Sequence, residues 1–124
     1  MNKDDVIESI REYVNKMVNN NSKMTYGLNF NEESIFFDTI YEYLEMIGRT
    51  HDYHAILYIV INRGLNNSIL SGEAVTLASL MGLIREIGSI GYTEEQISEL
   101  EKMLSVKPKS SKLKNLFKPK SETA

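Results

Sequence analysis

The stretch NEESIFFDTIYEYLEMIG, residues 31–48, decides the fold. Asn31 is a good N-cap residue, and two glutamates follow it where negative charge favours the N-terminal end of a helix. Apolar side chains then recur every three or four residues, which places them on one wide helix face. They are Ile35, Phe36, Phe37, Ile40, Tyr41, Leu44 and Ile47. With Gly48 as the C-terminal stop, the pattern predicts an amphipathic helix that needs a core to cover it.

The residues before this stretch predict another helix and an ordered loop. Apolar side chains recur at helical spacing over residues 3–18, and the polar run of residues 19–22 ends the pattern. Residues 24–30 contain Gly27, which weakens a regular strand, so we expect an ordered loop. This loop should send at least one of three side chains inward: Tyr26, Leu28 or Phe30.

Residues 51–63 are ambiguous, because they are apolar on nearly every side. Their β-branched content would suit a buried strand. Their length, with Thr50 as a cap and Gly64 as a stop, favours a helix. We expect a central, buried helix and keep the strand as the alternative.

The remaining sequence predicts a linker at residues 65–70, then a fourth helix that Ser71 caps and Gly88 ends. A capping-box pattern at residues 93–96 begins a last helix, whose apolar pattern stops at Leu104. The predicted fold is therefore all-α: a compact bundle of four to five helices with a flexible basic C-terminal tail. Its domain covers residues 1–104, and residues 105–124 form the tail, which we expect to be disordered.

Composition excludes several classes of protein. The chain has 124 residues and no cysteine, which removes disulfides, thiolate catalysis and cysteine-bound metals. The first residues include two acids and no apolar run, unlike a secretory signal. The longest apolar run, residues 55–61, is far shorter than the roughly 20 residues that cross a bilayer. We expect a cytoplasmic protein.

The charges are divided unevenly along the chain. Residues 1–104 carry 8 basic and 16 acidic side chains, a net charge of −8, whereas residues 105–124 carry 6 lysines and 1 glutamate, a net charge of +5. Such an asymmetry indicates an acidic body with a basic tail.

One polar cluster carries residues that bind metals: His51, Asp52 and His54. Imidazole and carboxylate groups are competent ligands, but His51 and Asp52 are adjacent and point in different directions on a helix. We expect a helix start here, and keep a metal or proton-transfer role as the alternative. Glycine-rich phosphate loops are absent, and the paired carboxylates fall in first turns of predicted helices. The sequence thus predicts no enzyme and no cofactor.

The second helix offers a candidate binding surface, because tyrosines alternate with acids in it. Rigid aromatic rings beside charges are typical of protein interfaces. The predicted partner-binding residues on the body are Asp38, Tyr41, Glu42, Tyr43 and Glu45. For any single tyrosine we favour packing of the ring in the core with its hydroxyl in water, whereas the acidic, tyrosine-bearing surface as a whole is the predicted binding face.

The tail adds a second candidate. Leu113, Leu116 and Phe117 share one face if residues 111–117 turn as a helix, as in a short motif that enters a groove. The alternatives are a disordered or self-docked tail, or non-specific binding of nucleic acid through lysines. Those lysines are Lys107, Lys109, Lys112, Lys114, Lys118 and Lys120.

The architecture is similar to small all-helical bacterial or phage proteins that act by binding, such as immunity proteins, inhibitors and adaptors. This similarity is one of fold alone, and no motif is specific to any of these families. The uneven charge and the absence of a catalytic constellation predict a non-enzymatic protein whose partner is another protein. A nucleic-acid-associated protein is the alternative. The apolar surplus on the third and fourth helices also allows a homodimer.

Overall fold

The computed structural model describes the backbone of residues 2–117 and the side chains of residues 2–106. Within these ranges the chain forms helices and no regular strand, so the predicted all-α class is confirmed. The α-helices are α1 (Lys3–Asn20), α2 (Phe30–Ile47), α3 (Tyr53–Ser71), α4 (Leu77–Gly82) and α5 (Glu94–Phe117). Two 3-10 helices accompany them, η1 (Thr50–Asp52) and η2 (Ile84–Ile90). None of the described helices has both the length and the apolar character that a bilayer crossing demands.

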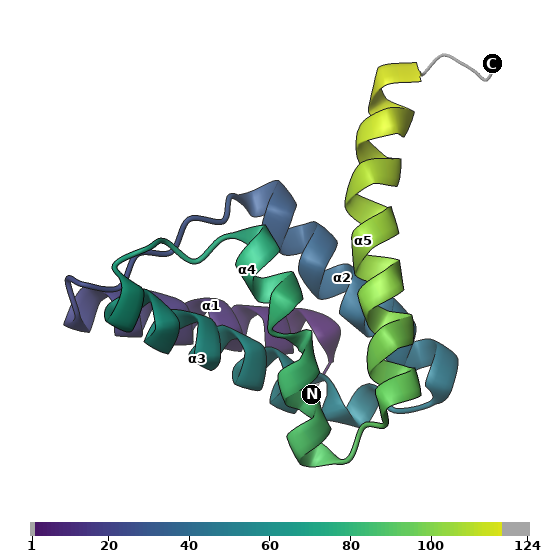
Figure 1. Ribbon diagram of the computed structural model, residues 1–124, viewed down its shortest axis with the longest axis horizontal. Helices are drawn as coiled ribbons and strands as arrows, with labels where there is room; N and C mark the ends of the chain where they lie inside the picture. The colour runs from purple at the N-terminus through teal and green to yellow at the C-terminus, as the bar shows by residue number, and fades with distance from the viewer. Residues whose placement is uncertain (1, 118–124) are drawn as a thin grey trace.

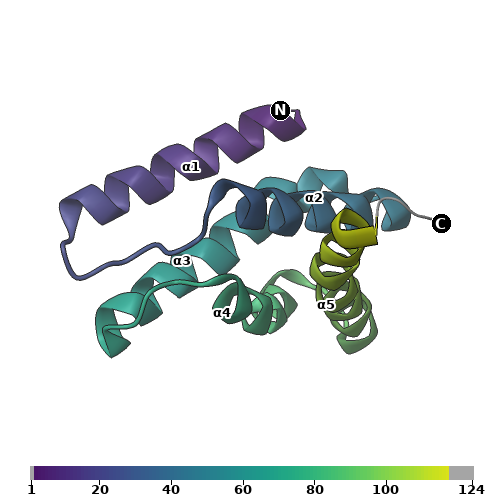
Figure 2. The same cartoon turned by 90° about the horizontal axis from the view of Figure 1, so that it is seen from above.

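Helix α3 lies in the middle of the bundle. It packs against α1 on one side and against α4 and η2 on the other, as Figure 2 shows. Helix α2 packs mainly on α5, which stands beside it and rises beyond the rest of the bundle (Figure 1). The arrangement leaves α1 and α2 as neighbours above α3, with their outer faces on the same side of the molecule.

The core is built from the apolar faces that the sequence predicts. Its largest fully buried side chains include Phe36 and Phe37 of α2 and Leu57 of α3. The Tyr53 hydroxyl lies in the same core, where it donates a hydrogen bond to the Phe37 carbonyl oxygen at 2.8 Å. Most of the apolar side chains of α3 lie in this core, while Tyr58 and Leu70 of the same helix are exposed.

Helix α2 begins earlier than predicted, because Asn29 caps it instead of Asn31. The Asn29 side chain accepts the Glu32 N–H at 2.8 Å, and the Glu32 carboxylate accepts the Asn29 N–H at 3.0 Å. This capping box satisfies two backbone donors at once. The predicted stop at Gly48 is confirmed, since this residue ends the helix at φ 72°.

The early start of α2 places Phe30 at its first position, where 68% of the residue is exposed. An inward position for Phe30 is therefore wrong. Tyr26 and Leu28 are half-buried, as expected, but Met24 is the loop residue that enters the core.

The expected helix over residues 51–63 is confirmed from Tyr53 onward, but the predicted cap is wrong: Thr50 begins η1, and Asp52 stands at the cap position of α3 without a side-chain capping hydrogen bond. The predicted linker at residues 65–70 is also wrong. Helix α3 continues to Ser71, because Leu65 and Ser68 extend its buried face. Gly64 is an interior helix residue and not a stop; Gly72, at φ 78°, ends the helix.

The predicted fourth helix is also wrong in its bounds. The chain is extended before Thr76, and Val75 forms a parallel bridge with Tyr26: the Gly27 N–H donates to the Val75 carbonyl at 2.8 Å. Thr76 then caps the short α4, and η2 follows as far as Gly91. The capping box at Thr93 is confirmed, with both of its hydrogen bonds to Gln96 formed.

Helix α5 is described as far as Phe117, past Leu104, where its apolar pattern ends. The side chains from residue 107 and all of residues 118–124 lie outside the described residues. The flexibility of the tail and the domain boundary at residue 105 stay predictions.

Candidate partner-binding surface

The acidic residues predicted on α2 do share one outer face. Asp38 is half-buried, and Glu42 and Glu45 are exposed. Tyr41 lies at the edge of this face, half-buried, with its ring centroid 5.0 Å from that of Tyr53. These four of the five predicted residues are thus brought together.

Tyr43, the fifth predicted residue, is a core residue and not part of the surface. It is 1% exposed, and its hydroxyl donates a hydrogen bond to a Glu99 carboxylate oxygen of α5 at 2.9 Å. Burial, together with this hydrogen bond, raises the pKa of the Tyr43 hydroxyl, which therefore keeps its proton. The sequence pattern failed here because position 43 falls on the side of α2 that α5 covers.

A groove between α1 and α2 adjoins the acidic face, with a volume of about 610 Å³. Two ion pairs bridge its ends: Lys3 to Asp38 at 3.3 Å, and Arg11 to Glu33 at 3.2 Å. Since these pairs join the start of α1 to the middle of α2 and the middle of α1 to the start of α2, the helices run antiparallel along the groove. Half-buried Ile7 lies between the two basic residues on α1.

An exposed aromatic ring lies at one end of the groove. The Arg11 guanidinium carbon is 5.0 Å from the centroid of the Phe30 ring, a cation–π distance. Arg11 also pairs with Glu33, so the same side chain holds the ring and the acid in position. The groove thus has an apolar contact point fixed by a charged neighbour.

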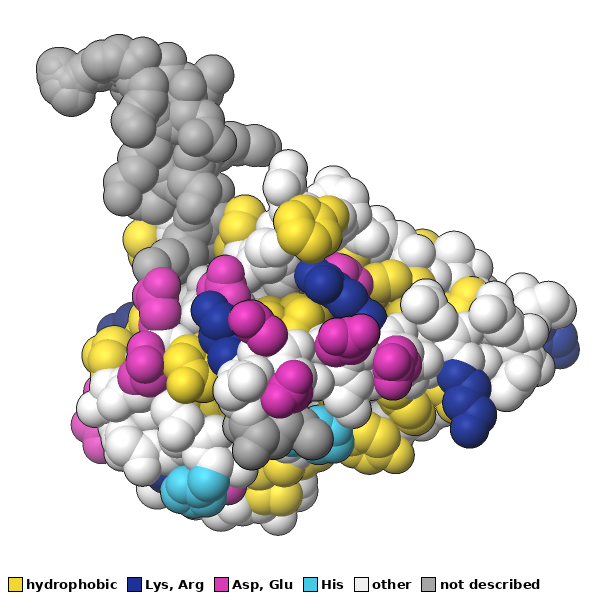
Figure 3. Space-filling view, turned by 180° about the vertical axis from the view of Figure 1, so that it is seen from behind, with side chains coloured by type: hydrophobic (Ala, Val, Ile, Leu, Met, Phe, Trp, Pro, Cys, Tyr) yellow, Lys and Arg dark blue, Asp and Glu magenta, His cyan; other side chains and the backbone are white. Residues whose placement is uncertain are grey.

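A row of carboxylates forms the α1 rim of the groove. Asp4, Glu8 and Glu12 are exposed and spaced i, i+4, i+8 on one helix face. Among the side chains that the structure describes, none makes an ion pair with them. Like charges four residues apart destabilise a helix by about 0.2–0.5 kcal/mol for each pair. Figure 3 shows this side of the molecule, where Asp and Glu side chains gather across the centre.

Sequence reasoning missed this α1 rim. The signal was the i, i+4, i+8 spacing of Asp4, Glu8 and Glu12, but the pattern alone does not say which helix lies beside it. Only the packing of α1 next to α2 turns the row into one wall of a groove.

The cluster at the start of α3 serves the fold. The Asp52 carboxylate accepts hydrogen bonds from Arg49 at 3.0 Å and from the Tyr92 hydroxyl at 2.7 Å. His51 lies 3.6 Å from the same carboxylate, whereas His54 stacks on Tyr58. Over the described residues no three His, Asp or Glu side chains converge as metal ligands.

The environment of Asp52 sets its charge. Burial acts to raise the pKa of this carboxyl, but the Tyr92 hydrogen bond and the Arg49 charge outweigh burial, so the pKa lies below its usual value. A lowered pKa in the folded state stabilises the protein above the unfolded pKa of about 4, and this contribution is lost as pH falls through the folded value. The cluster therefore joins η1 to the segment before α5 at neutral pH.

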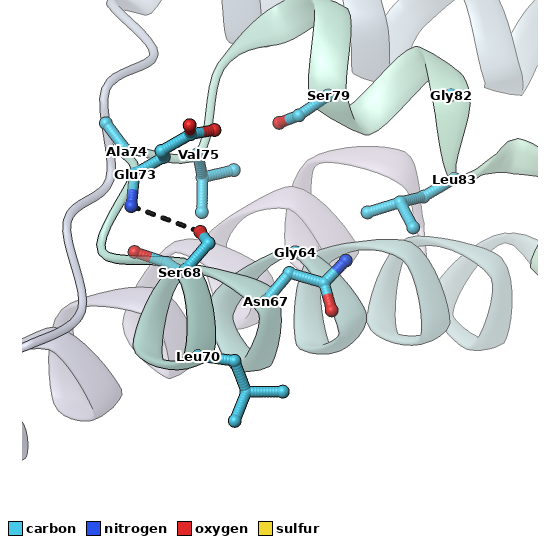
Figure 4. A pocket seen from close by; sticks show the side chains of 11 residues that line it. Gly64, Asn67, Ser68, Leu70, Glu73, Ala74, Val75, Ser79, Gly82 and Leu83 are labelled. Carbon is cyan, nitrogen blue, oxygen red and sulfur yellow. Dashed lines mark hydrogen bonds between the residues drawn. The ribbon is translucent and has the colours of Figure 1, made fainter.

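A second hollow, of about 470 Å³, lies between α3 and α4 (Figure 4). In the close-up, Val75 and Leu83 point into the space above Gly64, and Leu70 points away from it. Glu73 is the only charged residue of its lining, and its N–H is bonded to Ser71 Oγ at 3.1 Å. This hollow offers much less charge for recognition than the groove between α1 and α2.

The predicted tail residues lie outside the described side chains. Leu113, Leu116 and Phe117 belong to the backbone of α5, as do four of the lysines, and Lys118 and Lys120 lie beyond it. Their roles therefore stay predictions.

Comparison of the chain with protein-family models, with curated proteins and with solved structures gave no match. The surface is therefore interpreted from its own geometry and charge.

Proposed function

We propose that this protein acts without catalysis, by binding another protein, in the manner of an inhibitor, immunity factor or adaptor. The observation that carries the proposal is the groove between α1 and α2. It combines a row of exposed carboxylates, Asp4, Glu8 and Glu12, with the exposed ring of Phe30. The acidic face of α2 continues it.

The combination of an aromatic ring, an arginine and several carboxylates in one groove supports a protein as the partner. An exposed aromatic ring held beside an arginine is the kind of anchor that contributes most to protein interfaces. Surrounding charges steer the partner and select it by their sign, and contribute less to affinity. Phe30 and Arg11 supply the anchor, and the carboxylates supply the steering.

The negative charge of the groove favours a partner whose binding surface is basic. The groove's carboxylate on α2, Asp38, already pairs with Lys3, and Glu33 of the same helix pairs with the groove residue Arg11. The three on α1 have no ion-pair partner among the described side chains and lie at repulsive spacing. Lysine or arginine side chains entering the groove would relieve that repulsion. A nucleic acid would meet the same row as a like charge.

Affinity capture with the full-length protein tests the proposal. We expect the wild type to recover a specific protein from cells of its natural host, in a nuclease-treated lysate. Glu8→Lys should lose most of that protein, because the substitution reverses the charge at the centre of the rim. Glu73→Lys is the matched control: it makes the same change at an exposed site beside the other hollow.

Mass spectrometry of the captured material decides between the outcomes. A protein retained by the wild type and by Glu73→Lys, and lost by Glu8→Lys, supports the proposal. Recovery of no specific protein, or of nucleic acid alone, would overturn it. Equal recovery by all three proteins would place the binding surface elsewhere.

A further inference from the structure

We propose that the groove between α1 and α2 also takes the basic C-terminal segment, residues 107–120, of a second copy of this chain. The inference rests on the proposed function, since it uses the same groove. It names an occupant for the groove and a form of regulation. A copy whose groove holds the segment of a neighbouring copy cannot bind another partner there.

Charge complementarity is the first argument. The α1 rim carries three unpaired carboxylates about one helical turn apart, at Asp4, Glu8 and Glu12. The segment supplies six lysines and no acid: Lys107, Lys109, Lys112, Lys114, Lys118 and Lys120. No other stretch of the chain has such an excess of positive charge, and the body as a whole is acidic. The acidic rim of one copy and the basic segment of another therefore attract each other.

Apolar side chains of the groove and of the C-terminal segment are a second argument, because they can contact one another. The groove presents the exposed ring of Phe30 at one end and half-buried Ile7 within it. The segment carries three large apolar residues between its lysines, at Leu113, Leu116 and Phe117. Contact between these groups would remove apolar surface from water on both sides, which charge pairing at a surface does not do.

The direction of α5 favours a second copy over the same molecule. The helix is described to Phe117, and in Figure 1 its C-terminal half rises clear of the bundle. The groove lies against the body, between α1 and α2. A segment carried away from its own body along α5 is presented to a neighbouring molecule.

Sedimentation velocity of the full-length protein is the first test. At about 20 mM salt we expect reversible self-association that grows with protein concentration, and at about 500 mM salt a monomer, because salt screens exposed charges. The groove variant, Glu8→Lys with Glu12→Lys, should weaken association about tenfold or more. The control Glu73→Lys should associate like the wild type.

A mixing experiment distinguishes this contact from other kinds of association. The tail variant, Lys112→Glu with Lys114→Glu, should also fail to associate with itself. The groove variant retains an intact basic segment, and the tail variant retains an intact groove. An equimolar mixture should therefore form a 1:1 complex that neither variant forms alone.

A wild type that stays monomeric at low salt would overturn the inference, as would association that the groove and tail variants leave unchanged. A mixture that fails to associate would overturn it too. These results differ from a failure of the proposed function: if the capture experiment succeeds while the wild type stays monomeric, the groove binds another protein and not a second copy.

Discussion

Phe37→Ala is expected to lower the free energy of unfolding by about 3–5 kcal/mol, the usual loss when a buried phenylalanine is removed. The ring is fully buried on the face of α2 that meets the core. The Phe37 carbonyl oxygen also accepts the buried Tyr53 hydroxyl, so backbone movement around the new cavity would strain that bond. Urea denaturation followed by circular dichroism measures the loss.

Phe30→Ala on the same helix is the matched control. Its side chain is largely exposed and its main contact is with Arg11, so we expect a change below about 1 kcal/mol. Equal losses for the two variants would mean that α2 does not face the core as described.

Gly64→Leu is expected to cost about 3 kcal/mol by overpacking. A Cβ atom placed at Gly64 would lie 3.0 Å from Leu80 Cδ2 and 3.4 Å from Val75 Cγ1, so a leucine side chain would have to displace these two buried side chains. Figure 4 shows this glycine on α3 beneath the segment that carries Val75 and α4. Thermal unfolding should show a clear fall in the midpoint.

Gly82→Leu makes the same change at a site without such neighbours. Nothing lies within 4 Å of a Cβ at Gly82, which is exposed at the end of α4. Its effect should stay within about 0.5 kcal/mol. If Gly64→Leu were equally harmless, the close approach of α4 to α3 would be incorrect.

The fold was predictable where one helix carries a clear period. Residues 3–18 and 31–48 alternate apolar and polar faces at helical spacing, and α1 and α2 form there. The capping box at Thr93 was equally readable, because its two hydrogen bonds depend on residues three apart.

The α3–α4 region was not predictable, because tertiary contacts override local signals there. Gly64 resembles a helix stop in sequence, yet it lies inside α3, whose buried face continues to Leu65 and Ser68, and α4 approaches closely at this glycine. Val75 looks like a helix residue, yet it pairs with Tyr26 of a distant loop. Neither contact can be predicted from the residues that are adjacent in the sequence.

The candidate surface was predictable only in part, for the same reason. Asp38, which is half-buried, and Glu45, which is exposed, lie on the outer face of α2 and could be recognised from one helix alone. Tyr43 could not be excluded without knowing that α5 covers its side of α2. The α1 row matters only because α1 lies next to α2, which is a property of the assembled bundle.

The most direct test of the binding surface is photo-crosslinking in living cells of the natural host. A photoreactive amino acid at position 34, within the groove, is compared with one at position 67, in the hollow between α3 and α4. We expect a covalent adduct with a protein from position 34 and none from position 67. No adduct at position 34, or the same adducts from both positions, would contradict the proposed binding surface.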